Sequence, residues 1–308
     1  MKRIPIILFF LVLAPAASAQ RSIDEVLRQV ENASRELEAQ RQLTAAQKQD
    51  AATGKYMANP TVEMEKMWGA AGAGQNTELA VVQTIDFPTV YGSRNRIAKL
   101  KGSLYEKQWE SQRQQLLLQA KQLCIEIVYL YRQRDLLDER LSNAERLSDA
   151  YRRKMETGDA TSLEANKIAV ESISARTAAD LNRAELQAKI QQLNTMTGDS
   201  DDSFEDVTYP PVETLPPADV LSEAYMSGNP LLESMENTLE IDRRTVALNR
   251  GLSLPQFEVG YRHDYGEGRA TGFKVGMSVP LFENKNKVKA AKAAAVSSQA
   301  QLESARTN

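Results

Sequence analysis

The sequence offers few side chains for acid–base, nucleophilic or metal chemistry. It contains one histidine, His263, and one cysteine, Cys124, in 308 residues. One cysteine cannot form an intrachain disulfide or a cysteine zinc cluster, and one histidine leaves no histidine-pair metal site. We interpret His263 as a strand residue near a loop and Cys124 as a small buried apolar group. No Ser/His/Asp or paired-carboxylate arrangement is evident, so the sequence predicts no enzyme and no cofactor.

Two other patterns have a chemical interpretation that the spacing does not favour. Met57, Met64 and Met67 suggest soft-metal ligands, but side chains three apart on a strand point to opposite faces, so we predict no metal site. A glycine-rich stretch resembles a phosphate loop, but no helix follows it. We therefore expect an extracellular hairpin loop at Gly69, Gly72 and Gly74.

Composition narrows the class of protein. The chain has 38 basic and 41 acidic residues, a formal net charge of −3, and gives no electrostatic footprint for nucleic acid. Charged residues make up 26% and aromatics 6% of the chain, which favours long helices over one compact globule.

The beginning of the chain is typical of an exported protein. A basic start, a short apolar run and the sequence Ala17-Ser18-Ala19 predict a secretory signal peptide at 1–19. The rest has no apolar run near the roughly 20 residues of a spanning helix, so a membrane-inserted chain would have to use β-strands.

An internal repeat organises the remainder. A shift of 195 residues places Pro60 on Pro255 and Phe87 on Phe282, and upstream a one-residue adjustment places Leu37 on Leu231. We expect a first copy at 20–198, an acidic proline-rich connector at 199–217 and a second copy at 218–308. Because the second copy lacks most of a helical hairpin, we interpret the chain as C-terminally truncated.

Each copy contains two short strands with alternating polarity. In the second copy Phe257, Val259, Tyr261 and Tyr265 share one face, opposite Glu258, Gly260, Arg262 and Asp264. In the first copy the apolar face of Val62, Met64 and Trp68 is interrupted by Lys66, and the second strand, 79–86, is ambiguous.

A helical hairpin follows the first strand pair. The apolar spacing predicts a helix over 94–156, a tight turn at 157–161 and a return helix over 162–196. The apolar side of the return helix is expected to contain Leu163, Val170, Ile173, Leu181, Ile190 and Leu193.

Four strands are too few to close a membrane barrel, which needs at least eight. Sharing strands among three subunits would give twelve strands and remove the sheet edges. The expected fold class is therefore mainly α with membrane β-strands, in which long antiparallel coiled-coil helices accompany four strands per chain of a trimeric twelve-stranded β-barrel.

The chain resembles the TolC-type outer-membrane efflux proteins, nearest the heavy-metal and cation efflux branch. The resemblance covers residues 22–308 and rests on the repeat, Asn59 to Val62, Val82 to Pro88, Ser278 to Phe282, the hairpin turn and Leu193 to Gly198. It implies a homotrimer in the cell outer membrane, with helices extending into the periplasm. It also implies a periplasmic adaptor protein and an inner-membrane pump as partners, and a passive exit duct as function.

Three sets of site residues follow from this interpretation. The adaptor-contacting hairpin tip is expected at Gly158, Asp159, Ala160, Thr161, Ser162 and Leu163. The barrel lumen is expected to contain Glu63, Glu65, Arg262 and Asp264, and the aromatic belt at the membrane lipid interface Trp68, Tyr261 and Tyr265.

Two other functions stay open at this point. A periplasmic adaptor also has a long helical hairpin, but lipoyl-like segments rather than repeated strand pairs would flank it. A structural coiled-coil protein without a pore would not explain the alternating strands.

Overall fold

The computed structural model describes residues 22–68, 75–198, 209, 214–266, 269–280, 282 and 284–307. It divides into two units, one made of Met1–Arg35 and Leu116–Glu213 and the other of Glu36–Gln115 and Thr214–Asn308. The expected signal peptide, the loop at Gly69, Gly72 and Gly74, and most of the connector lie outside the described residues. Helix α3, Pro88–Thr157, contributes residues to both units.

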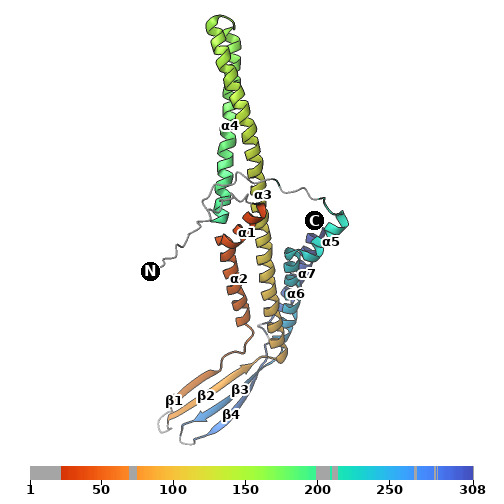
Figure 1. Cartoon of the computed structure of the whole chain (residues 1–308). Coiled ribbons are helices and arrows are strands. Elements are labelled where there is room, and N and C mark those ends of the chain that lie inside the picture. Colours follow the sequence, from red (N-terminus) through yellow and green to blue (C-terminus); the bar gives the residue numbers. More distant parts are fainter. Residues whose placement is uncertain are drawn as a thin grey trace, which may run out of the picture. The chain divides into compact units, whose positions relative to one another are not determined.

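The first unit is a helical hairpin with a short helix packed on it. The C-terminal part of α3 and helix α4, Ser162–Thr197, run side by side (Figure 1). Helix α1, Ile23–Ala33, begins after Ser22, whose hydroxyl accepts the Glu25 N–H at 3.2 Å. Its buried face of Ile23, Val26 and Val30 packs on α4. The hairpin predicted by the apolar spacing is confirmed, with α3 beginning at Pro88 instead of residue 94.

The inner face of α4 differs from the one expected. Ile190 and Leu193 are buried, as predicted. Leu163, Val170, Ile173 and Leu181 are instead 65–78% exposed, so their assignment to the packed side is wrong. The residues of α4 that are buried nearest the turn are small or polar: Ala175, Ala179 and Asn182. The error arises because α4 has apolar residues on two sides, and spacing alone does not tell which side meets α3.

The second unit contains the sheet and the helices that flank it in sequence. These helices are α2 (Arg35–Thr53), the N-terminal part of α3, α5 (Ala218–Gly228), α6 (Pro230–Gly251) and α7 (Lys287–Thr307). Asn229 ends α5 and caps α6, where its side chain accepts the Leu231 N–H at 2.9 Å and Pro230 takes the first helical position. Helices α6 and α7 pack through Leu232, Leu239 and Leu302.

The four strands form one antiparallel sheet in chain order (Figure 1). They are β1 (Thr61–Trp68), β2 (Gln75–Ile85), β3 (Gln256–Asp264) and β4 (Thr271–Ser278). The central pair, β2 and β3, joins the two copies of the repeat, with Val81 opposite Tyr261. The mainly helical fold with four strands per chain is confirmed.

The bounds of the first helix in each copy match without the one-residue adjustment. A shift of 195 residues superposes the bounds of α1, Ile23–Ala33, on those of α5, Ala218–Gly228. The same shift pairs Leu37, which is buried, with Leu232, which is also buried, whereas Leu231 is 45% exposed. The alignment of Leu37 with Leu231 is therefore wrong, because it pairs an inward residue with an outward one.

None of the helices within the described ranges has an apolar stretch sufficient to cross a lipid bilayer.

Candidate functional site

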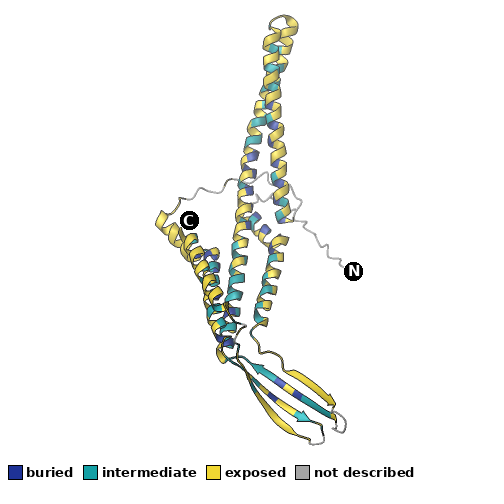
Figure 2. Ribbon diagram, turned by 180° about the vertical axis from the view of Figure 1, so that it is seen from behind, coloured by how far each residue is buried: buried dark blue, intermediate teal, exposed yellow. Residues whose placement is uncertain are grey.

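One face of the sheet is mainly apolar, although it also carries Lys66, Thr77, Gln83, His263 and Thr271. The registers place Val62, Val81, Tyr261 and Phe273 in one row across the four strands. The neighbouring rows add Met64 and Leu79 on one side and Val259, Val275, Phe257 and Met277 on the other. These side chains are not covered: Phe273 is 86% exposed, Val275 79% and Met64 74% (Figure 2). A contiguous apolar surface of this kind marks contact with lipid or with another protein.

The opposite face is polar, and it contains all four residues predicted for the lumen. Glu63 shares a row with Ala80 and Arg262, and Glu65 shares the next row with Glu78 and Asp264. The guanidinium of Arg262 lies 2.7 Å from the carboxylate of Glu78. Asp264 accepts hydrogen bonds from the Asn76 amide at 3.1 Å and from the Gly266 N–H at 2.9 Å.

Three further charged residues of this face were not among the four expected for the lumen: Glu78, Glu258 and Lys274. Glu258 and Lys274 follow from the alternation of the second copy, and Glu78 was missed because the strand that contains it was assigned to begin one residue later. With them, the face carries five carboxylates and two cationic groups: Glu63, Glu65, Glu78, Glu258 and Asp264 against Arg262 and Lys274.

Close packing of the strands depends on one glycine of the polar face. A Cβ at Gly260 would lie 2.8 Å from the Val81 carbonyl oxygen and 3.2 Å from a Val82 methyl group. Ala80 and Val82 beside it are buried. Small residues at the centre therefore allow the strands to approach one another.

The three aromatic residues predicted for the membrane interface lie on the apolar face, at two levels. Tyr265 stacks edge-on against His263, with ring centroids 4.4 Å apart, and Trp68 lies at the same end of the sheet. Tyr261 also makes an edge-on contact, with Phe273, at 6.2 Å between ring centroids. Tyr261 precedes Tyr265 by four residues, which is about 13 Å along a strand. Their place in an aromatic belt stays a prediction.

The hairpin turn is built by a glycine and a capping box. Gly158 has a φ of +81°, which only glycine adopts readily just after a helix. Thr161 Oγ1 accepts the Glu164 N–H at 3.3 Å, and the Glu164 carboxylate accepts the Thr161 N–H at 2.9 Å. Thr161 thus caps α4.

Asp159 does not cap the helix. Its carboxylate accepts the Thr157 hydroxyl at 2.7 Å and so tightens the turn on the α3 side. The reciprocal capping residue, Glu164, was missed, although the Thr-x-x-Glu spacing was present in the sequence. The hydrogen bonds from Thr161 hold the pKa of the Glu164 carboxyl below its ordinary value.

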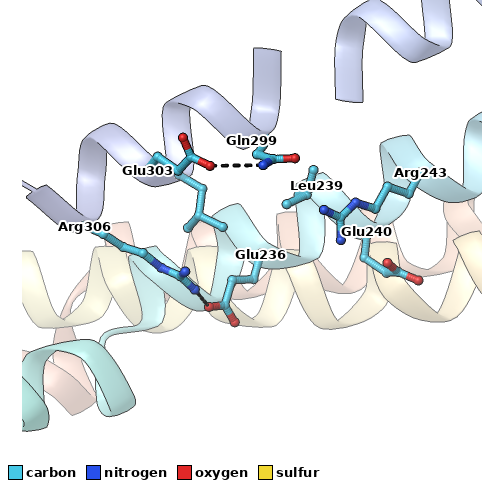
Figure 3. Close-up of a pocket in the computed structure, with 8 residues that line it drawn as sticks. Glu236, Leu239, Glu240, Arg243, Gln299, Glu303 and Arg306 are labelled. Atoms are coloured by element: carbon cyan, nitrogen blue, oxygen red, sulfur yellow. Dashed lines mark hydrogen bonds and ion pairs between the residues drawn. The ribbon is translucent and has the colours of Figure 1, made fainter. Parts of the chain in front are cut away.

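A groove also lies between α6 and α7 (Figure 3). It has a volume of about 340 Å³, with Leu239 and Leu302 at its base and an ion pair between Arg306 and Glu236 along its wall. It contains no nucleophile. Among the described residues no group of His, Cys, Asp or Glu side chains is arranged to hold a metal ion.

Cys124 lies where the sequence places it, fully buried within the hairpin. Burial raises the pKa of its thiol to about 12, so it is not an activated nucleophile.

No protein-family model matches the sequence, and no curated protein matches it. In structure, the chain is similar to the Campylobacter jejuni CmeC outer membrane channel, with a TM-score of 0.74 at 14% identity over 92% of this chain and 67% of that one. It is also similar to the Vibrio cholerae outer membrane protein VceC, with a TM-score of 0.71 at 11% identity over 92% and 75%. The fold is that of outer-membrane channel proteins. The chain is also similar in structure to a membrane protein from Pseudomonas aeruginosa, with a TM-score of 0.73 at 15% identity over 94% of this chain and 74% of that one.

The observed sheet bears on the two alternatives that the sequence leaves open. Both strand pairs join in one sheet with opposed polar and apolar faces, whereas an adaptor would have lipoyl-like flanking segments. A pore-free coiled coil would not need such a sheet.

Proposed function

We propose that this chain is the outer-membrane channel component of a tripartite efflux system, which passively conducts substrates from a periplasmic adaptor and inner-membrane pump to the outside. The observation that carries the proposal is the sheet with an uncovered apolar face and a charged face, on a chain with the channel fold. The apolar face would meet outer-membrane lipid, and the face of Glu63, Glu65, Arg262 and Asp264 would line the water-filled lumen.

The edges of the sheet support assembly with further copies. Strands β1 and β4 each pair on one side only within the described residues, and they run antiparallel to each other. The β4 edge of one copy is therefore able to extend the sheet with the β1 edge of the next. A homotrimer would close the sheet with twelve strands and leave no edge in lipid.

The hairpin tip from Gly158 to Leu163 is the proposed contact for the periplasmic adaptor. Its backbone is fixed by the capping box, and Leu163 is 78% exposed. A preordered turn with an exposed apolar side chain suits docking, because little conformational entropy is lost on binding.

The test is to express the full-length gene that encodes this chain in a Gram-negative host and to fractionate the envelope. We expect a detergent-extracted, heat-modifiable trimer in the outer-membrane fraction that gives discrete conductance steps in a planar bilayer. A water-soluble monomer in the periplasmic fraction, with no conductance, would overturn the proposal.

A further inference from the structure

The two hairpins of the sheet are equivalent, but the second is one residue longer. Val62 pairs with Val81 in the first hairpin, and Phe257 pairs with Met277 in the second. Val62 and Phe257 are 195 residues apart in the sequence, whereas Val81 and Met277 are 196 apart. Strand β1 therefore maps onto β3 with a shift of 195, and β2 maps onto β4 with a shift of 196.

The polarity of the side chains supports this mapping. With the longer shift, Val81 of β2 falls on Met277 of β4, and both lie on the apolar face of the sheet. A shift of 195 would instead place Val81 on Gly276, which lies on the polar face. Because side chains alternate between the two faces, the longer shift is the one that keeps both faces in place.

The β2–β3 pairing is an observed example of the contact that the sheet edges would make between chains. It joins the last strand of one repeat copy to the first strand of the other, as β4 of one chain would join β1 of the next. In this pairing Leu79 lies opposite His263, and Val81 lies opposite Tyr261. The two shifts transfer this register to the outer edges of the sheet.

We propose that β4 of one chain pairs with β1 of the next in the transferred register, which places Val275 opposite Trp68 on the apolar face. The same register places Ser278 opposite Glu65 on the polar face. The partner is a second copy of this chain. The inference rests on the proposed function, because that function requires the sheet edges to close into a ring.

The proposed register continues the stagger of the observed sheet. A row across the sheet connects Val62 to Tyr261. Tyr261 is the counterpart of Lys66, so the row advances four residues along the repeat while it crosses two strands. The row that begins at Val259, which corresponds to position 64 of the first copy, reaches Trp68 of the next chain after the same advance. A uniform advance inclines every strand of the ring equally, and an even advance keeps each face continuous from chain to chain.

The pairs that this register forms are compatible on both faces. Trp68 is 70% exposed in the single chain and Val275 is 79% exposed, and an aromatic side chain opposite a β-branched one is a favourable cross-strand pair. On the polar face, Ser278 places no like charge opposite Glu65. A slip of one residue would bring Val275 opposite Met67 of the polar face, and both faces would be interrupted at the seam.

Paired cysteines test the register in outer membranes from cells that express the full-length gene in a Cys124→Ser background. Opposed residues of an antiparallel pair have Cα atoms about 4.5–5.5 Å apart, which a disulfide spans. A displacement of two residues, about 7 Å along a strand, takes them out of its reach. Within one chain, β1 and β4 are the outer strands of the sheet and lie about 14 Å apart, so a disulfide between them joins two chains.

The opposed pairs should crosslink, and a displaced pair should not. We expect Val275→Cys with Trp68→Cys to give covalent trimers on non-reducing gels. Ser278→Cys with Glu65→Cys should give the same result from the polar face. The displaced pair, Val275→Cys with Lys66→Cys, should crosslink at least about tenfold less.

An internal pair serves as the matched control. Leu79→Cys with His263→Cys is the counterpart of the first pair within one chain and should form an intrachain disulfide. Stronger crosslinking of the displaced pair than of the opposed pairs, or trimers that no interchain pair crosslinks, would overturn the register and leave the ring of chains intact. Migration as a monomer with every interchain pair, while the internal pair oxidises, would overturn the ring and the proposed function with it.

Discussion

The guanidinium of Arg262 lies 2.7 Å from the carboxylate of Glu78 and joins the two copies of the repeat across the centre of the sheet. Glu78 is 14% exposed and Arg262 52%, on a face where carboxylates outnumber cationic groups. Arg262 thus lowers the negative charge of the surface proposed as the lumen.

Removing that positive charge should change ion selectivity. Arg262→Gln leaves Glu78 without its cationic partner, so we expect the cation-to-anion permeability ratio to rise, as read from reversal potentials in a planar bilayer under a salt gradient. Glu63→Gln should change the ratio in the opposite direction. A ratio unaffected by either variant would show that this face does not line the pore.

The two faces should tolerate a new charge very differently. Val275→Lys places a cation on the apolar face and should destabilise the lipid-inserted protein by about 2–4 kcal/mol if the site is near the bilayer midplane. Ser278→Lys, on the polar face of the same strand, should have little effect. Urea unfolding in lipid vesicles measures both, and equal losses of stability would contradict the assignment of faces.

The hairpin tip should be sensitive to charge and bulk. We expect Asp159→Lys combined with Ala160→Trp to weaken binding to the cognate adaptor about tenfold or more, because the change alters both the charge and the shape of the turn. Site-specific crosslinking and efflux assays are the measurements. Glu139→Lys, an exposed change on α3 away from the turn, is the control. Unchanged crosslinking and efflux would remove this site.

The turn should lose stability in acid. The pKa of Glu164 is lowered by hydrogen bonds from Thr161, so its contribution is complete above the ordinary value of 4.5 and is lost as the pH falls through the lowered folded value. The protection factor of the amides at the start of α4, which corrects for the intrinsic pH dependence of exchange, should therefore fall on acidification below about pH 4.5. In Glu164→Ala this pH dependence should disappear. If the pH dependence persists in that variant, a group other than Glu164 causes it.

Cys124 should resist thiol reagents while the protein is folded. Burial raises its pKa to about 12, so at pH 8 almost no thiolate is present and the sulfur is out of reach. Maleimide labelling should be at least about 100-fold slower than that of Ser142→Cys in a Cys124→Ser background. In urea the two rates should become similar. Fast labelling of native Cys124 would indicate that the buried part of the α3–α4 hairpin around it opens readily.

The sequence predicted the faces of the sheet better than those of the helices. Strand alternation has a period of two, so placing Phe257 on one face and Glu258 on the other follows once the strand is recognised. Strand β2 was ambiguous because Gln83 and Thr84 interrupt its polarity pattern. The inner side of α4 was misassigned because Leu163 and Val170 satisfy helical spacing as well as Ile190 does. Their direction depends on where α3 lies, which a single sequence does not specify.

The β2–β3 pairing connects the two copies of the repeat within one polypeptide. This pairing bears on how the proposed closed sheet of three chains arises. If β4 of one copy pairs with β1 of its neighbour, that seam repeats the internal one, since each joins the end of one half to the start of another. An ancestral chain of half the length, with a single pair of strands, would have needed six molecules to encircle the same opening. Fusing two such genes halves the number of molecules that must meet and leaves each half free to diverge.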